Sequence, residues 1–186
     1  MQIRKRCGGW LLLVGGLCSA GAGAEPSKAM QFNALLSGAQ VLPAVETGVR
    51  ALVRVTFDPA FTEVEIAFET DSNLVVTTAS MNCGLAGEDG PVVLDLLGPG
   101  PLLDIRDGTR LTLDQTQIGS TGCEFAIGRP INNVVALAFA MREGLVYVTL
   151  GTDQAPGGAL RGQLLSVAET GALELPDDRL AAPFPR

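Results

Sequence analysis

Two neighbouring stretches with apolar residues at every second position constrain the fold most strongly. They run from Arg50 to Phe57 and from Phe61 to Thr70. The alternating apolar positions are Ala51, Val53, Val55 and Phe57 in the first stretch and Val64, Ile66 and Phe68 in the second. A period of two is typical of a strand with one buried face and one exposed face. The two stretches therefore predict an antiparallel β-hairpin.

The turn between the two strands sets the predicted register of the hairpin. With a two-residue turn at 59–60, Val53 lies opposite Ile66 in the core, and Arg54 lies opposite Glu65 on the exposed face. Opposite charges in facing positions favour this register, although each exposed pair contributes little free energy.

Shorter strand patterns recur along the rest of the chain. Strands are predicted at residues 30–36, 74–82, 91–97, 145–150 and 159–165, and 110–118 fit a strand within an otherwise ambiguous stretch, 102–122. One helix is predicted over Pro130–Arg142, where apolar residues recur with helical spacing and Gly144 follows as a stop. The expected fold class is therefore all-β and antiparallel, with one short helix near 130–142.

Both ends of this region resemble the CHRD domain, a module named for chordin. The opening FNALLSGAQVLPAVETGVRALVRVTFDP and the closing run YVTLGTDQAPGGALRGQL carry the resemblance, which spans about Gln31 to Leu165. The resemblance implies a Greek-key β-sandwich similar to copper/zinc superoxide dismutase. We expect this domain to occupy residues 25–167, with a partly disordered tail at 168–186 that is rich in Pro and Asp.

The family pattern also carries histidines that this chain lacks. The family run A-H-I-H-G-x-A aligns its two histidines with Ser80 and Asn82, and a third family histidine aligns with Gly151; the chain contains no histidine. Serine, asparagine and glycine are poor ligands for copper or zinc. We therefore expect no metal, no cofactor and no catalytic residues here, but a polar hydrogen-bonded patch or a pocket for another kind of ligand.

The first 24 residues have the features of a signal peptide. A basic start and a short apolar run, residues 10–17, precede an Ala-Gly-Ala motif that ends at Ala24. The run is too short to span a bilayer as a helix. Cleavage is predicted between Ala24 and Glu25, with export to the periplasm or the extracellular space. Lipidation at Cys18 is the alternative, although Leu17 and Gly15 do not fit the lipobox pattern.

Charge argues against nucleic acid and anionic membrane surfaces as partners. The whole chain has 13 basic and 20 acidic residues. Without the three basic residues of the leader, 10 basic residues face 20 acidic ones, a net charge of −10. Phosphate binding requires clustered Lys and Arg. The expected partner is an unidentified protein or a component of the cell envelope, and the oligomeric state stays open.

Two cysteines, Cys83 and Cys123, remain after removal of the leader. In an oxidising compartment such a pair is expected to form a disulfide. A thiolate metal site is the alternative, but the chain has no Cys-x-x-Cys motif.

Acidic loops are the remaining candidates for a cation site. They contain Glu88-Asp89, Asp104 with Asp107, and Asp153, and none has the regular spacing of a calcium loop. Solvated carboxylates are the simpler interpretation, and Met81 is expected to fill the core.

These observations favour a non-enzymatic binding or structural module. The alternative class is a metal-binding protein or metal-dependent enzyme that uses Met, Cys and carboxylate ligands.

We predict that the exported protein begins at Glu25, because the Ala-Gly-Ala motif directly precedes it. Intact-mass measurement of protein from an exporting host checks this. An acylated Cys18 at the N-terminus would contradict it.

Overall fold

The computed structural model describes residues 29–97, 103–105, 109–119 and 122–167. The predicted signal peptide with its Ala24–Glu25 cleavage site, the tail 168–186 and Asp107 lie outside the described residues.

Strands dominate the described part of the chain. They are β1 Met30–Ser37, β2 Arg50–Phe57, β3 Glu63–Thr70, β4 Leu74–Val76, β5 Thr78–Cys83, β6 Val92–Asp95, β7 Leu103–Ile105, β8 Thr109–Asp114, β9 Val146–Gly151, β10 Leu160–Gln163 and β11 Leu165–Ser166. The helices are α1 Cys123–Ile127 and α2 Val134–Arg142, with short 3₁₀ turns η1 Gly38–Gln40 and η2 Gln115–Gln117.

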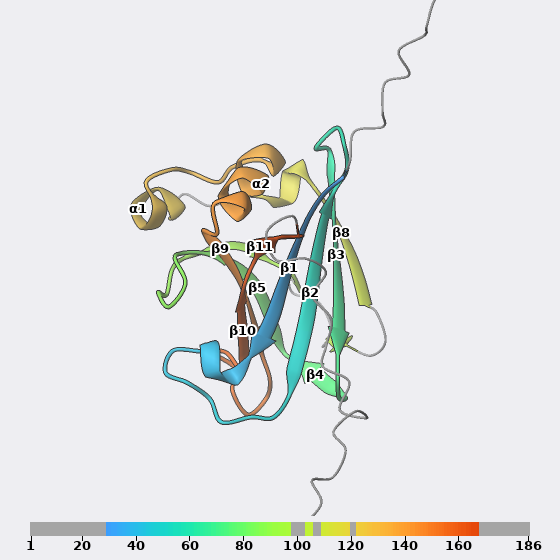
Figure 1. Cartoon of the computed structure of the whole chain (residues 1–186), viewed down its shortest axis with the longest axis vertical. Coiled ribbons are helices and arrows are strands. Elements are labelled where there is room, and N and C mark those ends of the chain that lie inside the picture. The colour runs from blue at the N-terminus through green and yellow to red at the C-terminus, as the bar shows by residue number, and fades with distance from the viewer. Residues whose placement is uncertain (1–28, 98–102, 106–108, 120–121, 168–186) are drawn as a thin grey trace, which may run out of the picture.

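The strands form one large curled sheet. Its order is β6-β5-β9-β10-β1-β2-β3-β8, with β11 added beside β1 (Figure 1). The pairings in it are antiparallel, and β4 pairs with β7 in a small second sheet. The predicted all-β antiparallel class is confirmed. The finer expectation of a Greek-key sandwich like that of superoxide dismutase stays a prediction.

The inner face of the curled sheet and helix α2 enclose the hydrophobic core. Phe32 of β1 packs edge to face on Phe57 of β2, with ring centroids 5.8 Å apart. Met81 of β5 is fully buried in the same core, as its place in the sequence predicted. Helix α2 lies across one end of the sheet (Figure 1) and adds Leu137 and Met141 to the core. On β5, β9 and β10 the opposite face carries polar side chains, among them Ser80, Thr149 and Arg161.

The β2–β3 hairpin exists, but its predicted register is wrong by two residues. Val53 lies opposite Phe68, and Val55 lies opposite Ile66. A shift of two residues leaves each side chain on its predicted face, because side chains alternate along a strand.

Asp58 explains the shift, because its side chain organises a longer turn than predicted. The carboxylate accepts hydrogen bonds from the backbone amides of Ala60, Thr62 and Glu63, at 3.1, 2.7 and 2.7 Å. Phe61 adopts a positive φ of 55° within this loop. The bonds, that from the Glu63 amide first, hold the pKa of Asp58 below its ordinary value.

The predicted cross-strand ion pairs change with the register. Arg54 bonds to Glu69 instead of Glu65, with Nε 3.3 Å from Oε1. Glu65 pairs with Arg110 of β8, at 2.5 Å.

The prediction of a single helix over Pro130–Arg142 is also corrected. Helix α2 begins at Val134, because Asn133 has an extended backbone and its side-chain oxygen accepts the amide of Ala136 at 2.7 Å. Helix α1 was not predicted, since its five residues are too few to show a helical period. Within the described ranges, neither helix is long and apolar enough to cross a membrane.

Two predicted strands are each divided. Residues 74–82 form β4 and β5, because β4 leaves the large sheet to pair with β7. Residues 159–165 form β10 and the start of β11, with a break at Leu164, whose amide bonds to the carbonyl of Val146.

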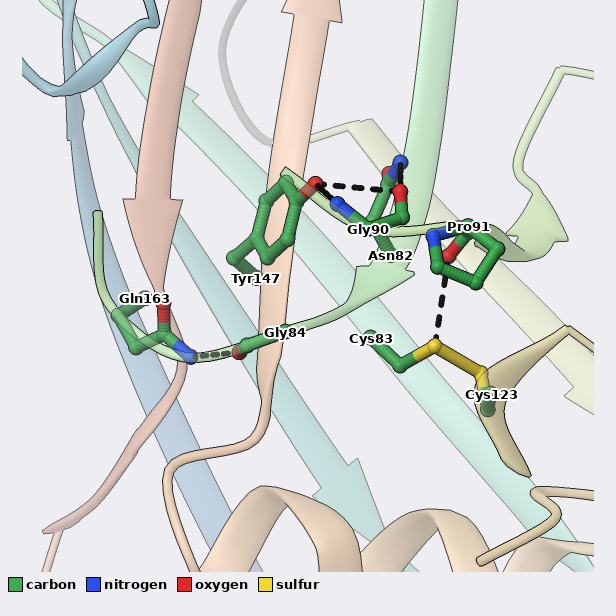
Figure 2. Close-up of a disulfide and its surroundings, with 8 residues drawn as sticks. All are labelled: Asn82, Cys83, Gly84, Gly90, Pro91, Cys123, Tyr147 and Gln163. Atoms are coloured by element: carbon green, nitrogen blue, oxygen red, sulfur yellow. Dashed lines mark hydrogen bonds between the residues drawn. A yellow bond between two sulfur atoms is a disulfide. The ribbon is translucent and has the colours of Figure 1, made fainter. Parts of the chain in front are cut away.

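A disulfide joins Cys83 at the end of β5 to Cys123 at the start of α1 (Figure 2). The two cysteines are 40 residues apart in sequence and fully buried. The bond therefore ties the unpredicted helix α1 to the sheet.

We predict that replacing both cysteines by alanine lowers the free energy of unfolding by about 4 kcal/mol, the chain-entropy value for a loop of this length. Denaturant titration of the oxidised protein and the double variant measures the difference. Reduced wild-type protein serves as the matched control and should unfold near the midpoint of the variant. Two reactive thiols in non-reduced protein would contradict the prediction.

Candidate functional site

A polar surface covers the outward face of β5, β9 and β10. In the sheet, Ser80 lies opposite Thr149, and Asn82 lies opposite Tyr147. Their neighbours in sequence, such as Met81 and Val148, point into the core. On β10, Arg161 lies opposite Thr149, and Gln163 lies opposite Tyr147. Alternation along three adjacent strands therefore brings these polar side chains together.

The structure places the three positions that align with family histidines on this one face. Ser80 and Asn82 are two residues apart on β5, and Gly151 of β9 pairs with Thr78. A Cβ atom at Gly151 would lie 2.2 Å from Thr78 Oγ1 and 2.6 Å from the carbonyl oxygen of Pro156. No side chain fits at Gly151 unless its neighbours move, so this position has no room for an imidazole.

Ser80 and Asn82 bond to each other instead of projecting freely. Asn82 Nδ2 donates to the carbonyl oxygen of Gly90 at 3.3 Å, and Ser80 Oγ donates to Asn82 Oδ1 at 2.8 Å. A carbonyl oxygen can only accept, so the Asn82 amide has one orientation, and the single proton of Ser80 is committed to it. Both side chains are therefore engaged in hydrogen bonds within the protein.

Tyr147 holds the loop between β5 and β6 against the same face. Its hydroxyl accepts the amide of Gly90 at 2.8 Å and lies 3.3 Å from the carbonyl oxygen of Gly90 (Figure 2). A Cβ atom at Gly90 would lie 1.8 Å from the carbonyl oxygen of Cys83, so only glycine permits this close approach. Gln163 fixes the start of the loop through a bond from Nε2 to the carbonyl oxygen of Gly84, at 3.1 Å (Figure 2).

Arg161 is a buried cation beneath the same loop. Its side chain is only 4% exposed, and its Cζ lies 3.7 Å from the centroid of the Tyr147 ring. Nη1 donates to Asp89 Oδ1 at 2.8 Å, and Nη2 donates to the carbonyl oxygen of Glu88. These contacts give Arg161 a structural role, because its guanidinium is held by a charge-assisted hydrogen bond and by the ring of Tyr147.

A cavity of about 510 Å³ lies over the polar face. Its lining combines Ser80, Asn82, Thr149 and Arg161 with the carboxylates Asp89 and Asp95. Apolar walls come from residues distant in sequence: Val41, Leu42, Val92, Leu97 and Pro156. The sequence patterns did not predict these walls. Part of the lining could have been found from the closing motif YVTLGTDQAPGGALRGQL. This motif contains the lining residues Tyr147, Thr149, Pro156 and Arg161.

The candidate cation ligands do not assemble into a site in the described residues. Asp89 bonds to Arg161, and Asp153 lines a separate cavity of about 780 Å³ beside the loops at 45–49 and 152–155. Only the backbone of Asp104 is described. Within the ranges the structure describes, no group of three or more His, Cys, Asp or Glu side chains lies close enough to hold a metal ion.

Comparison with models of known protein families gives a match. A family model described as CHRD domain matches residues 32–164, more than half of the chain. No curated protein and no solved structure matches the chain.

We predict that Arg161→Lys lowers the free energy of unfolding by about 1–3 kcal/mol, because an ammonium cannot keep both hydrogen bonds and the stacking on Tyr147. Denaturant unfolding measures this. Arg110→Lys is the matched control, since Arg110 pairs with Glu65 while 68% exposed. Its effect should stay below about 0.5 kcal/mol. Equal losses in the two variants would contradict a structural role specific to Arg161.

Proposed function

The chain belongs to the CHRD-domain family, and on that premise we propose that it is an exported, non-enzymatic binding module. Its ligand occupies the cavity over Ser80, Asn82 and Thr149. One observation carries the proposal. Where the family aligns histidines, this chain has a hydrogen-bonded polar face beneath a preformed cavity.

Three features support export to the periplasm or the extracellular space. The sequence has a basic start, an apolar run and an Ala-Gly-Ala motif at its beginning. The Cys83–Cys123 disulfide fits an oxidising compartment. The excess of acidic residues keeps an exported protein soluble.

The environment of the hydroxyl groups supports binding over catalysis. A nucleophilic serine or threonine needs a base that takes its proton. Ser80 donates its proton to the neutral amide oxygen of Asn82, and Thr78 donates to the carbonyl oxygen of Pro156 at 3.0 Å. Neither acceptor is a general base.

The alternative of a metal site built from Met, Cys and carboxylates has little support from the geometry. Met81 is buried on the core face of β5, away from the cavity. Cys83 is committed to its disulfide with Cys123. The two soft ligands are therefore unable to join Asp89 or Asp95 around one ion.

A cavity-filling variant tests the proposal of a binding module. Ligand-observed NMR with a library of small polar compounds should detect binders of mature wild-type protein that are lost in Thr149→Trp, because the indole fills the cavity. Thr112→Trp is the matched control, since Thr112 is exposed on β8, across the sheet from the cavity. Near-ultraviolet circular dichroism verifies that both variants fold. A library without any binder sensitive to Thr149→Trp would overturn the proposal.

Metal analysis tests the alternative class. Copper or zinc added to the oxidised mature protein should bind no more tightly than about micromolar, roughly −8 kcal/mol. A stoichiometric ion of submicromolar affinity that Asn82→Ala removes would move the protein into the metal-binding class.

A further inference from the structure

Two threonine hydroxyl groups at the cavity have no hydrogen-bond partner within the described ranges. Thr149 lies in β9 on the polar face, opposite Ser80 on one side and Arg161 on the other. Its half-buried hydroxyl is able to donate and to accept. Thr77 borders the same cavity with a buried Oγ1 atom. Because this oxygen has no bond to lose, its side chain can turn toward a ligand without breaking one.

The floor of the cavity offers both donors and acceptors. Ser80 Oγ gives its proton to Asn82 Oδ1 and keeps acceptor sites. Asn82 Nδ2 has two hydrogens and uses one of them on the carbonyl oxygen of Gly90. Thr149 can fill either role. A ligand that satisfies this floor must therefore donate and accept over a short distance, and hydroxyl groups do both through a single atom.

The charged side chains of the lining are engaged within the protein. The guanidinium of Arg161 is 4% exposed, stacks on Tyr147 and donates to Asp89. Asp95 accepts the backbone amide of Leu97 at 3.1 Å. A charged ligand would compete with these contacts, whereas a neutral ligand leaves them in place. The lining therefore favours a neutral ligand.

The walls of the cavity are apolar where the floor is polar. Leu42 and Val92 are 43% and 51% exposed, which is high for large aliphatic side chains. Pro156 extends this wall. A ligand with C–H groups on one face would bury apolar surface against it. The ligand should therefore be amphipathic, with hydroxyl groups on one side and carbon on the other.

We propose that the ligand of this cavity is a neutral carbohydrate, bound through one pyranose ring. The inference rests on the proposed binding function and specifies its ligand class. Ring hydroxyls bond to Ser80, Asn82 and Thr149, and the C–H face of the ring packs against Leu42 and Val92. The volume of about 510 Å³ is in the range of sites for small molecules.

A sugar satisfies this lining better than an apolar ligand or an ion does. An apolar ligand would cover the Thr149 hydroxyl and the Asn82 amide without bonding to them, and a covered polar group that lacks a partner costs free energy. A metal ion would need several charged ligands, and within the ranges that the structure describes no cluster of three such side chains is assembled. Hydroxyl groups on a carbon ring meet both parts of the cavity.

Titration followed by ligand-observed NMR tests the inference with neutral sugars. The probes are the methyl pyranosides of glucose, galactose and mannose. At least one should bind mature oxidised protein with an affinity that added salt leaves unchanged, because the sugar carries no charge. Cyclohexanol has a six-membered ring and one hydroxyl, and it should bind at least about fivefold more weakly. Glucosamine and glucuronate, which add a positive or a negative charge to the ring, should bind no more tightly than the neutral sugars.

A substitution of nearly equal volume tests the role of the Thr149 hydroxyl. Thr149→Val removes the hydroxyl and should weaken binding of the sugar about fivefold while leaving cyclohexanol unchanged. Thr112→Val is the matched control, because Thr112 is exposed on β8, away from the cavity, and it should leave both affinities unchanged. Near-ultraviolet circular dichroism verifies the fold of both variants.

The outcomes separate failure of the carbohydrate inference from failure of the binding function. Cyclohexanol that binds as tightly as the sugars, or a charged sugar that binds about tenfold more tightly than the neutral ones, would overturn the inference. Equal effects of Thr149→Val and Thr112→Val would also overturn it. If no sugar binds while the polar library yields other ligands sensitive to Thr149→Trp, the ligand class is wrong and the binding function stands. If the library yields none either, both proposals fail.

Discussion

Burial of one face of the curled sheet controls where the other side chains of this protein can lie. The strands β1, β2, β3, β5 and β9 each send every second residue into a core that helix α2 closes at one end (Figure 1). The intervening residues must then point outward. The polar face of Ser80, Asn82, Tyr147, Thr149 and Arg161 is a direct consequence, because a core of Phe32, Phe57 and Met81 lies behind it. The polar face and the hydrophobic core therefore lie on opposite faces of the same strands.

A network of hydrogen bonds stabilises this polar face. Asn82 and Tyr147 both bond to Gly90, and Arg161 bonds to Glu88 and Asp89 in the same loop. The loop between β5 and β6 is thereby held over the sheet by protein groups. A buried guanidinium that lost these partners would be costly, because its charge would stay in a low-dielectric environment. The disulfide adds a covalent tie next to this loop, since Cys83 directly precedes Gly84.

The hydrogen bonds of this network determine which polar groups at the cavity already have partners within the protein. Ser80 and Thr78 donate their hydroxyl protons to protein acceptors, and Arg161 pairs with Asp89 at the same face. The histidines of the family pattern could bind a metal ion in this place. Here the same backbone positions belong to an internal hydrogen-bonded pair and to a glycine without space for a side chain. The side chains at these positions therefore differ in chemistry from the histidines of the family pattern.

The sequence by itself determined the features that depend on local pattern. The alternation over Arg50–Thr70 predicted the hairpin and the correct face of each residue, and the two cysteines outside the predicted leader predicted the disulfide. The lack of histidine argued against an imidazole metal site before any geometry was known. These conclusions need only the period of a strand and the chemistry of side chains.

Only the tertiary structure decided the features that depend on contacts between distant segments. Asp58 lengthened the turn through bonds to three amides and moved the register by two residues. Helix α1 is too short to show a period and is tied to the sheet by Cys123. The cavity joins Val41, Ser80, Asp95 and Pro156. Their proximity follows from the pairing order of the strands, which local sequence patterns do not encode because each strand can satisfy its hydrogen bonds with more than one neighbour.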